Sequence, residues 1–317
     1  RLTAFGQQWG QVHVQLTPPS IPGALNVLRL TGEQVHGNVQ WLPISAGTRG
    51  NFVADLDRLH LNIKNLRGKV PEEAKEGEPV AFVPTPIINP AQWPAIQLEC
   101  QDLRVGGEKL GALSLSTTQI EGGLQIKNFS LKSNAGEMSA QGFWIHRKGQ
   151  SSAQVVGQLQ RSDVIQLQTA LGYKALIEAE NTNIQFDLQW LPSALGIDWG
   201  ALNGRTTILL KDGHARSIEP GVARILGLLS ITALPRRLML DFGDVADTGL
   251  RFDRISADFV INAGNAYTQN FQLKSTGVDM HMTGRIGLGA TDYDNHIKIY
   301  PEVSSSVALA GLAAGGP

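Results

Sequence analysis

The 317-residue chain has a single cysteine, Cys100, and few charged or aromatic residues. One cysteine excludes an internal disulfide, and it fits an oxidising compartment as well as a reducing one. Charged residues make up 17% of the chain and the net charge is −1, so the chain lacks the large basic face that binds nucleic acid by releasing counterions. Nucleic acid is therefore not an expected partner.

Long hydrophobic runs are missing as well. The chain contains no stretch of about 18 apolar residues that could span a bilayer, and residues 1–10 show no basic-then-apolar signal pattern. Strand-like sequence starts abruptly at Arg1, and residues 307–317 are a run rich in Ala, Gly and Leu. We interpret the chain as a fragment of a longer protein.

Apolar residues, at 42% of the chain, recur on alternate positions in many short segments. In 183–190, Ile184, Phe186 and Leu188 share one side of an extended strand, and Gln185 and Asp187 face the other way. The same alternation predicts a set of residues that line one apolar groove: Ile96, Leu98, Ile184, Phe186, Leu188, Ile208, Leu210, Ile255, Phe259, Ile261, Val278, Met280, Met282, Ile286, Ile297 and Ile299.

The pattern indicates roughly seventeen strands in an antiparallel meander. Turn signals separate them at 106–107, 122–123, 211–213 and 262–264. A sheet of this size curls, closes or splits, because open flat sheets rarely exceed about ten strands. We expect a mostly β fold: a long curled antiparallel sheet that forms an apolar groove, with a few short helices near the C-terminal end.

Residues 71–94 interrupt the alternation with six prolines and an acidic cluster. Proline cannot donate to a sheet ladder, so we interpret this segment as an exposed linker or loop. It divides the chain into a β-groove segment (1–70), the linker (71–94) and a C-terminal β-groove module (95–317).

Two stretches have helical spacing. One lies at 162–172, and the other lies at 220–236, where Val222, Ile225, Leu226 and Leu229 form an apolar stripe that we interpret as a gating helix. Arginines flank this second helix. Their guanidinium groups suit a lipid phosphate, and the alternative is that they face solvent at the helix ends: Arg224, Arg236 and Arg237.

Two or three helices are too few to cover the apolar face of such a sheet. The face must therefore pack on a second sheet, as in an ordinary β-sandwich, or against something that is not protein. An acyl chain of about sixteen carbons costs on the order of 12 kcal/mol to expose to water, which a continuous apolar trough would largely remove. The alternation leaves the sandwich and the lipid groove both open.

Catalytic and metal-binding patterns are sparse. The seven histidines never fall at zinc-ligand spacing, and no cofactor is expected. Asp292, Asp294 and His296 alternate on one strand and either bind a cation or form a solvated strand edge. The chain has no nucleophile elbow, P-loop or dinucleotide fingerprint, which favours a protein that is not an enzyme.

From about residue 95 onward the sequence resembles the AsmA-like proteins of Gram-negative envelopes, most closely their YhdP branch. The resemblance is strongest after Pro220. It is carried by 221–230 (GVARILGLLS), 236–238 (RRL), 240–245 (LDFGDV), 249–253 (GLRFD), 264–268 (GNAYT) and 291–294 (TDYD), with 142–144 (GFW) upstream.

The resemblance implies an elongated, curled sheet with an apolar interior, in the periplasmic part of a protein anchored in the inner membrane. It also implies a passive conduit for phospholipids, with a membrane at each end of the full-length protein and with protein partners that the sequence does not identify. The alternative is a structural or assembly factor of the envelope that conducts no lipid. An enzyme acting on a lipid or glycan is a third class.

Overall fold

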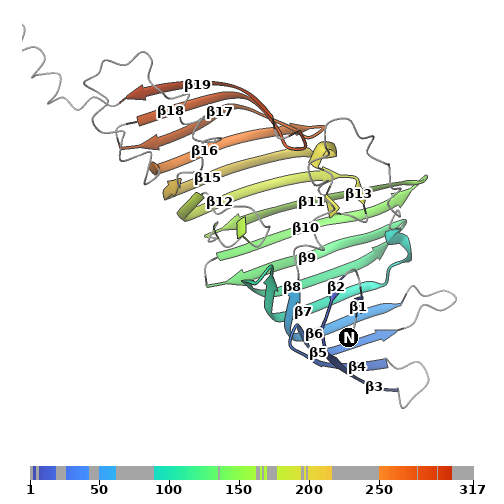
Figure 1. The fold of residues 1–317 in the computed structure, drawn as a ribbon. Coiled ribbons are helices and arrows are strands. Elements are labelled where there is room, and N and C mark those ends of the chain that lie inside the picture. The colour runs from blue at the N-terminus through green and yellow to red at the C-terminus, as the bar shows by residue number, and fades with distance from the viewer. Residues whose placement is uncertain are drawn as a thin grey trace, which may run out of the picture.

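The computed structural model describes residues 3–4, 7–18, 26–42, 50–61, 89–134, 136–161, 165, 168–169, 177–193, 196–197, 199–215, 250–276, 278–290 and 292–301. Fifteen strands form one sheet, curled and not closed on itself, with β3 at one edge and β19 at the other (Figure 1). The predicted fold class is confirmed. An arc of fifteen strands extends roughly 70 Å across the strands.

The strands of this sheet are β3 (Val12–Thr17), β4 (Asn26–Gly32), β5 (Val35–Leu42), β6 (Asn51–Leu61), β7 (Ala95–Val105), β8 (Glu108–Ile120), β9 (Gly123–Ser133), β10 (Gly136–Arg147), β11 (Gln150–Gln160), β12 (Ile177–Trp190), β15 (Asn203–Ala215), β16 (Leu250–Asn262), β17 (Asn265–Ser275), β18 (Val278–Gly287) and β19 (Tyr293–Pro301). Two short pairs lie outside it: β1 (Thr3–Ala4) with β2 (Gln7–Gln8), and β13 (Pro192–Ser193) with β14 (Gly196–Ile197). Two 3₁₀ turns are η2 (Pro90–Gln92) and η3 (Trp199–Ala201).

The sheet is antiparallel at every junction except that of β6 with β7, which is parallel. A parallel pair needs a long crossover, because the chain must return to the end where it started. β6 and β7 are neighbours in one sheet, although the segment that the sequence marks as a linker lies between them in the chain. The division into 1–70, 71–94 and 95–317 stays a prediction.

The segment that leads into β7 lies against the sheet. Pro90 is fully buried, and η2 contacts β9 and β10. The ring of Trp93 packs edge-on against Trp144 of β10, with 5.5 Å between their centroids. Gln119 Nε2 donates to the Trp93 carbonyl at 3.4 Å. The described part of 71–94 is thus packed in place, and residues 71–88 lie outside the described residues.

One turn prediction is wrong. Lys211, Asp212 and Gly213 lie inside β15, where Lys211 pairs with Asn181 and Gly213 pairs with Ala179. Asp212, between them, has a φ of 52°, and the strand pairing continues on both sides of it without a shift in register. A positive φ inside a strand suits the same residue types as a turn does, so the residue types alone do not distinguish the two.

Glycine allows the close strand approach that accompanies the curl. Gly204 of β15 and Gly284 of β18 have φ values of 138° and 141°, a region that other residues rarely adopt. A Cβ at Gly204 would overlap the carbonyl oxygen of Asp187, and one at Gly284 would overlap that of Asp294. These close approaches bend the sheet locally, as glycine kinks do in barrels.

The strand ends form two rims. The right rim, on the right in Figure 1, carries the turns between β10 and β11, between β16 and β17, and between β18 and β19. The left rim carries the turns between β7 and β8, between β9 and β10, and between β17 and β18. Of the predicted helix at 162–172, Ile165, Gln168 and Thr169 are described and helical; residues 220–236 lie outside the described residues.

Candidate lipid-binding face

The register of the strands builds one apolar row across twelve strands, from β3 to β16. The side chains of residues paired directly opposite each other lie on the same face of a sheet, so the pairings identify which residue of the next strand continues the row. The row consists of Leu16, Leu28, Val39, Ala54, Leu98, Leu115, Phe129, Ala140, Gly157, Phe186, Thr206 and Phe259. Thr206 is its one polar member.

The neighbouring row, one residue along each of the same strands, is polar throughout. It consists of Gln15, Arg29, Asn38, Asp55, Glu99, Ser114, Ser130, Ser139, Gln158, Gln185, Thr207 and Asp258. We call the side of the sheet that holds the first row the apolar face and the other side the polar face. From β3 to β16 the sheet therefore presents an apolar surface on one side and a polar surface on the other.

All sixteen groove residues predicted from the sequence lie on the apolar face. Ile96 and Leu98 pair with Phe52 and Ala54 of β6. Twelve further residues lie outside the row but on the same face, as alternation along each strand and pairing between strands show: Ile184, Leu188, Ile208, Leu210, Ile255, Ile261, Val278, Met280, Met282, Ile286, Ile297 and Ile299. That these side chains contact lipid stays a prediction.

Burial on this face is intermediate over much of its length. Leu210, Ile255, Ile261 and Met282 are buried, and most of the other predicted lining residues are half-buried. Three buried clusters lie here: one from β5 to β8 around Cys100, one around Leu210 and Ile255, and one around Leu202 and Ile261. Burial raises the pKa of the Cys100 thiol, which therefore packs as a small apolar group.

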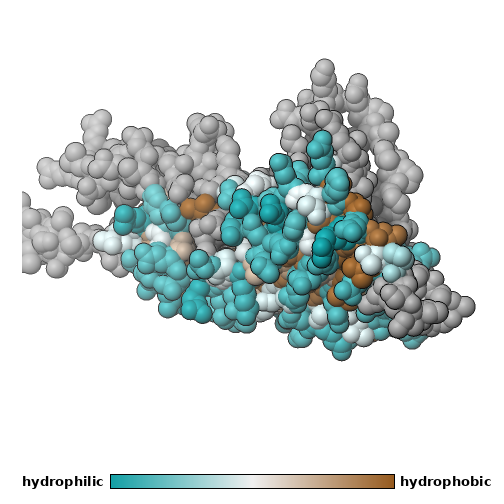
Figure 2. All heavy atoms as spheres, turned by 90° about the horizontal axis from the view of Figure 1, so that it is seen from below, coloured by the Kyte–Doolittle hydropathy of each residue, from teal (hydrophilic) through white to brown (hydrophobic). Residues whose placement is uncertain are grey.

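The apolar face reaches solvent at both edges of the sheet. Val14 and Leu16 on β3 are 48% and 55% exposed, and Ile299 on β19 is 38% exposed. In Figure 2, which looks up from below Figure 1, hydrophobic residues gather in the upper right part of the described surface, above a margin that is mainly hydrophilic. An apolar strip that is partly sheltered in the middle and open at both ends has the form that a passing acyl chain needs.

Aromatic rings cover glycines on the apolar face. A Cβ built on Gly157 would lie 2.7 Å from Phe186 Cζ, so the Phe186 ring lies directly over Gly157. The ring of Phe252 covers Gly213 in the same way. Ala140 of β10 and Gly157 of β11 are small members of the apolar row, and the predicted lining set names no residue of these two strands.

Polar groups gather on the other face. A hollow of about 650 Å³ crosses β9 to β15 there, lined largely by polar side chains such as Lys127, Gln158 and Arg205. Asp258 accepts hydrogen bonds from Thr207 Oγ1 at 2.6 Å and from Asn270 Nδ2 at 2.7 Å, which lower the pKa of its carboxyl. This face suits water and polar ligands, not acyl chains.

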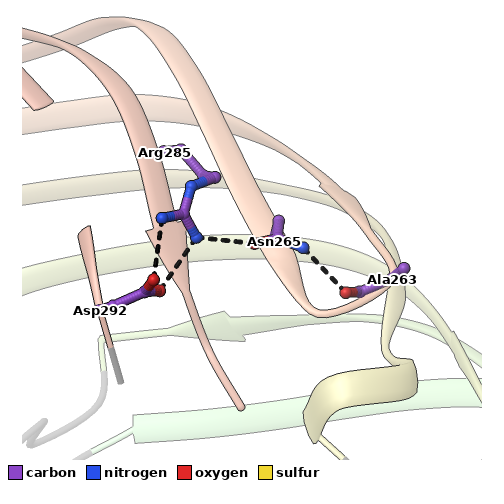
Figure 3. A network of polar contacts seen from close by, with 4 residues as sticks. All are labelled: Ala263, Asn265, Arg285 and Asp292. Carbon is purple, nitrogen blue, oxygen red and sulfur yellow. Dashed lines mark hydrogen bonds and ion pairs between the residues drawn. The ribbon is translucent and has the colours of Figure 1, made fainter. Parts of the chain in front are cut away.

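Of the predicted cation cluster of Asp292, Asp294 and His296, Asp292 is held in an ion pair. Asp292 forms a two-pronged ion pair with Arg285, with Nη1 to Oδ1 at 2.9 Å and Nη2 to Oδ2 at 3.0 Å (Figure 3). This pairing lowers the pKa of Asp292 and raises that of Arg285. Among the described residues, no group of three or more His, Cys, Asp or Glu side chains is placed to hold a metal.

The predicted gating helix and headgroup contacts fall outside the described residues. Val222, Ile225, Leu226, Leu229 and the arginines Arg224, Arg236 and Arg237 all belong to this part of the chain, and their roles stay predictions. In the described parts of the chain, no helix has the length and hydropathy to cross a bilayer.

The family model described as "YhdP protein" matches residues 1–317. A relative in Escherichia coli strain K12, named "Intermembrane phospholipid transporter YhdP", is 25% identical over 319 residues, which cover all of this chain and 24% of the relative. The chain thus spans about a quarter of the length of that relative. No solved structure matches.

Proposed function

Because the chain belongs to the YhdP protein family, we propose that it is one segment of a non-enzymatic conduit for phospholipids between the inner and outer membranes of a Gram-negative envelope. The observation that carries the proposal is the apolar row, which passes through twelve strands beside an entirely polar row. The relative's printed name, a phospholipid transporter, supports phospholipid as the cargo.

The mechanism is differential solvation. Acyl chains slide along the apolar face at right angles to the strands, and headgroups stay in water beside the rims. Each buried methylene is stabilised by about 0.8 kcal/mol, so a chain of about sixteen carbons avoids on the order of 12 kcal/mol of exposure. A face of this kind gives no direction to the movement, so net flux requires a gradient or a partner protein.

The proposed location follows from membership of the family. This segment would lie in the periplasm as part of a longer protein anchored in the inner membrane, with a membrane at each end of the full-length protein. The gating helix at 220–236 and the three arginines beside it would act on lipid entry or exit. Replacing Leu226 and Leu229 with Asp should then reduce transport and leave the fold intact.

Site-specific photo-crosslinking tests the conduit. A photoreactive residue replaces Phe186, Met280 or Ile299 on the apolar face, or its sequence neighbour Gln185, His281 or Lys298 on the polar face. The conduit predicts that co-purifying phospholipid crosslinks at the first three positions and not at their neighbours. Each control differs from its partner by one residue and by the face on which it lies.

A lipid-free protein with no crosslink at Phe186, Met280 or Ile299 would refute the conduit and support the envelope scaffold. Crosslinking of equal strength on both faces would show non-specific lipid and would refute it too. Native mass spectrometry of the same preparations gives the number of lipids that each chain holds.

A further inference from the structure

A second row of paired residues on the polar face crosses β10 to β17 and holds three exposed apolar side chains. Strand pairing joins each member of this mixed row to the next: Gln141, Val156, Asp187, Arg205, Val260 and Tyr267. Val156 is 42% exposed, Val260 is 56% exposed and Tyr267 is 44% exposed. Single exposed apolar side chains are ordinary on a protein surface, but three in one row of a polar face indicate a surface that contacts a ligand.

Two adjoining hollows lie along the polar face beside this row. The hollow of about 650 Å³ across β9 to β15 is lined by the first four members of the mixed row. A second hollow, of about 430 Å³, crosses β7 to β10 and shares Asn128 and Ser139 with the first. The two hollows therefore form one shallow trough across the strands. Together with Val260 and Tyr267 this surface extends roughly 40 Å from β7 to β17, a length that suits an extended polymer.

The charges that line the trough balance. They are three cations and three carboxylates: Lys127, Lys132, Arg205, Glu99, Glu137 and Asp187. Lys132 forms an ion pair with Glu137 at 3.1 Å, and Asp187 accepts a hydrogen bond from Gln154 Nε2 at 2.6 Å. A strongly charged polymer is attracted to a surface with an excess of the opposite charge. The balance of charges therefore favours a neutral polymer.

Several hydrogen-bonding side chains of the trough are available to a ligand. No described residue forms a hydrogen bond or ion pair with the side chain of Gln141, Gln185 or Arg205, and all three are exposed. A glutamine amide both donates and accepts hydrogen bonds, as the hydroxyl groups of a sugar do. These side chains therefore suit a polyhydroxylated ligand.

The spacing of the strands also matches a sugar chain. Neighbouring members of the mixed row lie one strand spacing apart, about 4.8 Å, and a pyranose ring of an extended glycan is about as long. A glycan that crosses the strands would therefore place one ring over each member. The C–H faces of its rings would pack on Val156, Val260 and Tyr267, and its hydroxyls would bind the polar members between them.

A protein partner fits this surface less well. Protein interfaces have a contiguous apolar centre, whereas Asp187 and Arg205 separate Val156 from Val260 along the mixed row. A polypeptide also cannot add as a strand here, because the strands of the trough are already paired on both sides.

We propose that the trough and the mixed row bind a neutral, extended glycan that crosses the strands on the polar face. The site lies on the side of the sheet opposite the apolar face, so a bound glycan leaves the path of the acyl chains open. The glycan site goes beyond the proposed conduit, because glycan binding is measured without any lipid.

Titration calorimetry of the purified chain with chitohexaose and with cellohexaose tests the site. Both probes are neutral, extended sugar hexamers, and at least one should bind with a Kd below about 1 mM. Tyr267→Ala should raise that Kd about tenfold, because it removes the ring on which a sugar packs. Tyr300→Ala is the matched control. Tyr300 is a 52% exposed tyrosine on the polar face of β19, outside the mixed row, and its loss should leave the Kd unchanged.

A second pair of variants tests the hydrogen bonds. Gln185→Ala should raise the Kd about fivefold, because it removes an amide that faces the ligand in the trough. Gln15→Ala is the matched control, since Gln15 is an exposed glutamine of the polar face on β3, far from the trough. Thermal unfolding of each variant confirms that it folds, which exposed positions favour.

Three outcomes would overturn the glycan site: no binding of either hexamer to the unmodified chain, equal loss in the two tyrosine variants, or tighter binding of polyglutamate or polylysine than of both hexamers. The last would assign the trough to a charged polypeptide. Failure of the glycan site and failure of the conduit are distinguishable. Lipid crosslinked at Phe186 without hexamer binding would leave the conduit and remove the glycan site, and the reverse result would do the opposite.

Discussion

A charge placed on the apolar face should block the passage of lipid, and Ile184 is the position to test. Ile184 is half-buried on β12 and lies between Leu159 of β11 and Ile208 of β15 on the apolar face. An extended acyl chain that crosses this strand places roughly four methylenes over one strand spacing of about 4.8 Å. Ile184→Asp removes their apolar contact.

Losing four methylene contacts costs about 3.2 kcal/mol, which slows passage at this point roughly two-hundredfold. The assay is the transfer of radiolabelled phospholipid between inner and outer membranes, in cells whose only family member is the full-length protein with this substitution. Gln185→Asp is the control, because it introduces the same charge one residue away on the polar face. It should leave transfer unchanged.

Unchanged transfer in a folded Ile184→Asp protein would refute the reasoning, since no acyl chain could then depend on this strand. An equal loss of transfer in Ile184→Asp and Gln185→Asp would refute it as well. The loss would then come from the added charge and not from its position on the apolar face. Thermal unfolding of both proteins separates a blocked face from a damaged fold.

Three further predictions concern the sheet itself. Gly204→Ala should lower the free energy of unfolding by at least about 2 kcal/mol, because the added Cβ meets backbone at a positive φ, whereas Gly149→Ala, in an open turn, should cost about 1 kcal/mol; similar unfolding midpoints for the two would contradict this. The folded-state pKa of Asp258 is lowered, so its carboxylate stabilises the fold at pH above about 4 and this stability is lost as the pH falls through the folded pKa. Asp258→Asn should therefore lower the urea midpoint slightly at pH 7, and the difference should close in acid; a difference independent of pH would exclude this cause. Trp93→Ala should cost about 2 kcal/mol by removing the ring contact with Trp144, measured by urea unfolding, and a change below about 0.5 kcal/mol would show that the end of the crossover does not stabilise the sheet.

Some features of the long-range structure could not be predicted from the sequence. The parallel pairing of β6 with β7 joins strands on either side of a crossover, and no local pattern encodes which strand will lie beside which. The sequence around Asp212 resembles a turn, because a positive φ suits the same residue types in a strand as in a turn. The predicted lining set names no residue of β10 or β11, where Ala140 and Gly157 are small and the Phe186 ring lies over Gly157.

The sequence by itself determined the fold class and the composition of the two faces. Side chains alternate with a period of two along a strand, so the opposition of Ile184 and Phe186 to Gln185 is readable from adjacent residues alone. Only the tertiary structure decided that these strands pair in a register that joins Leu16 to Phe259 in one row. Pairing and curvature arise from contacts between residues far apart in the chain, and those contacts exist only once the sheet has formed.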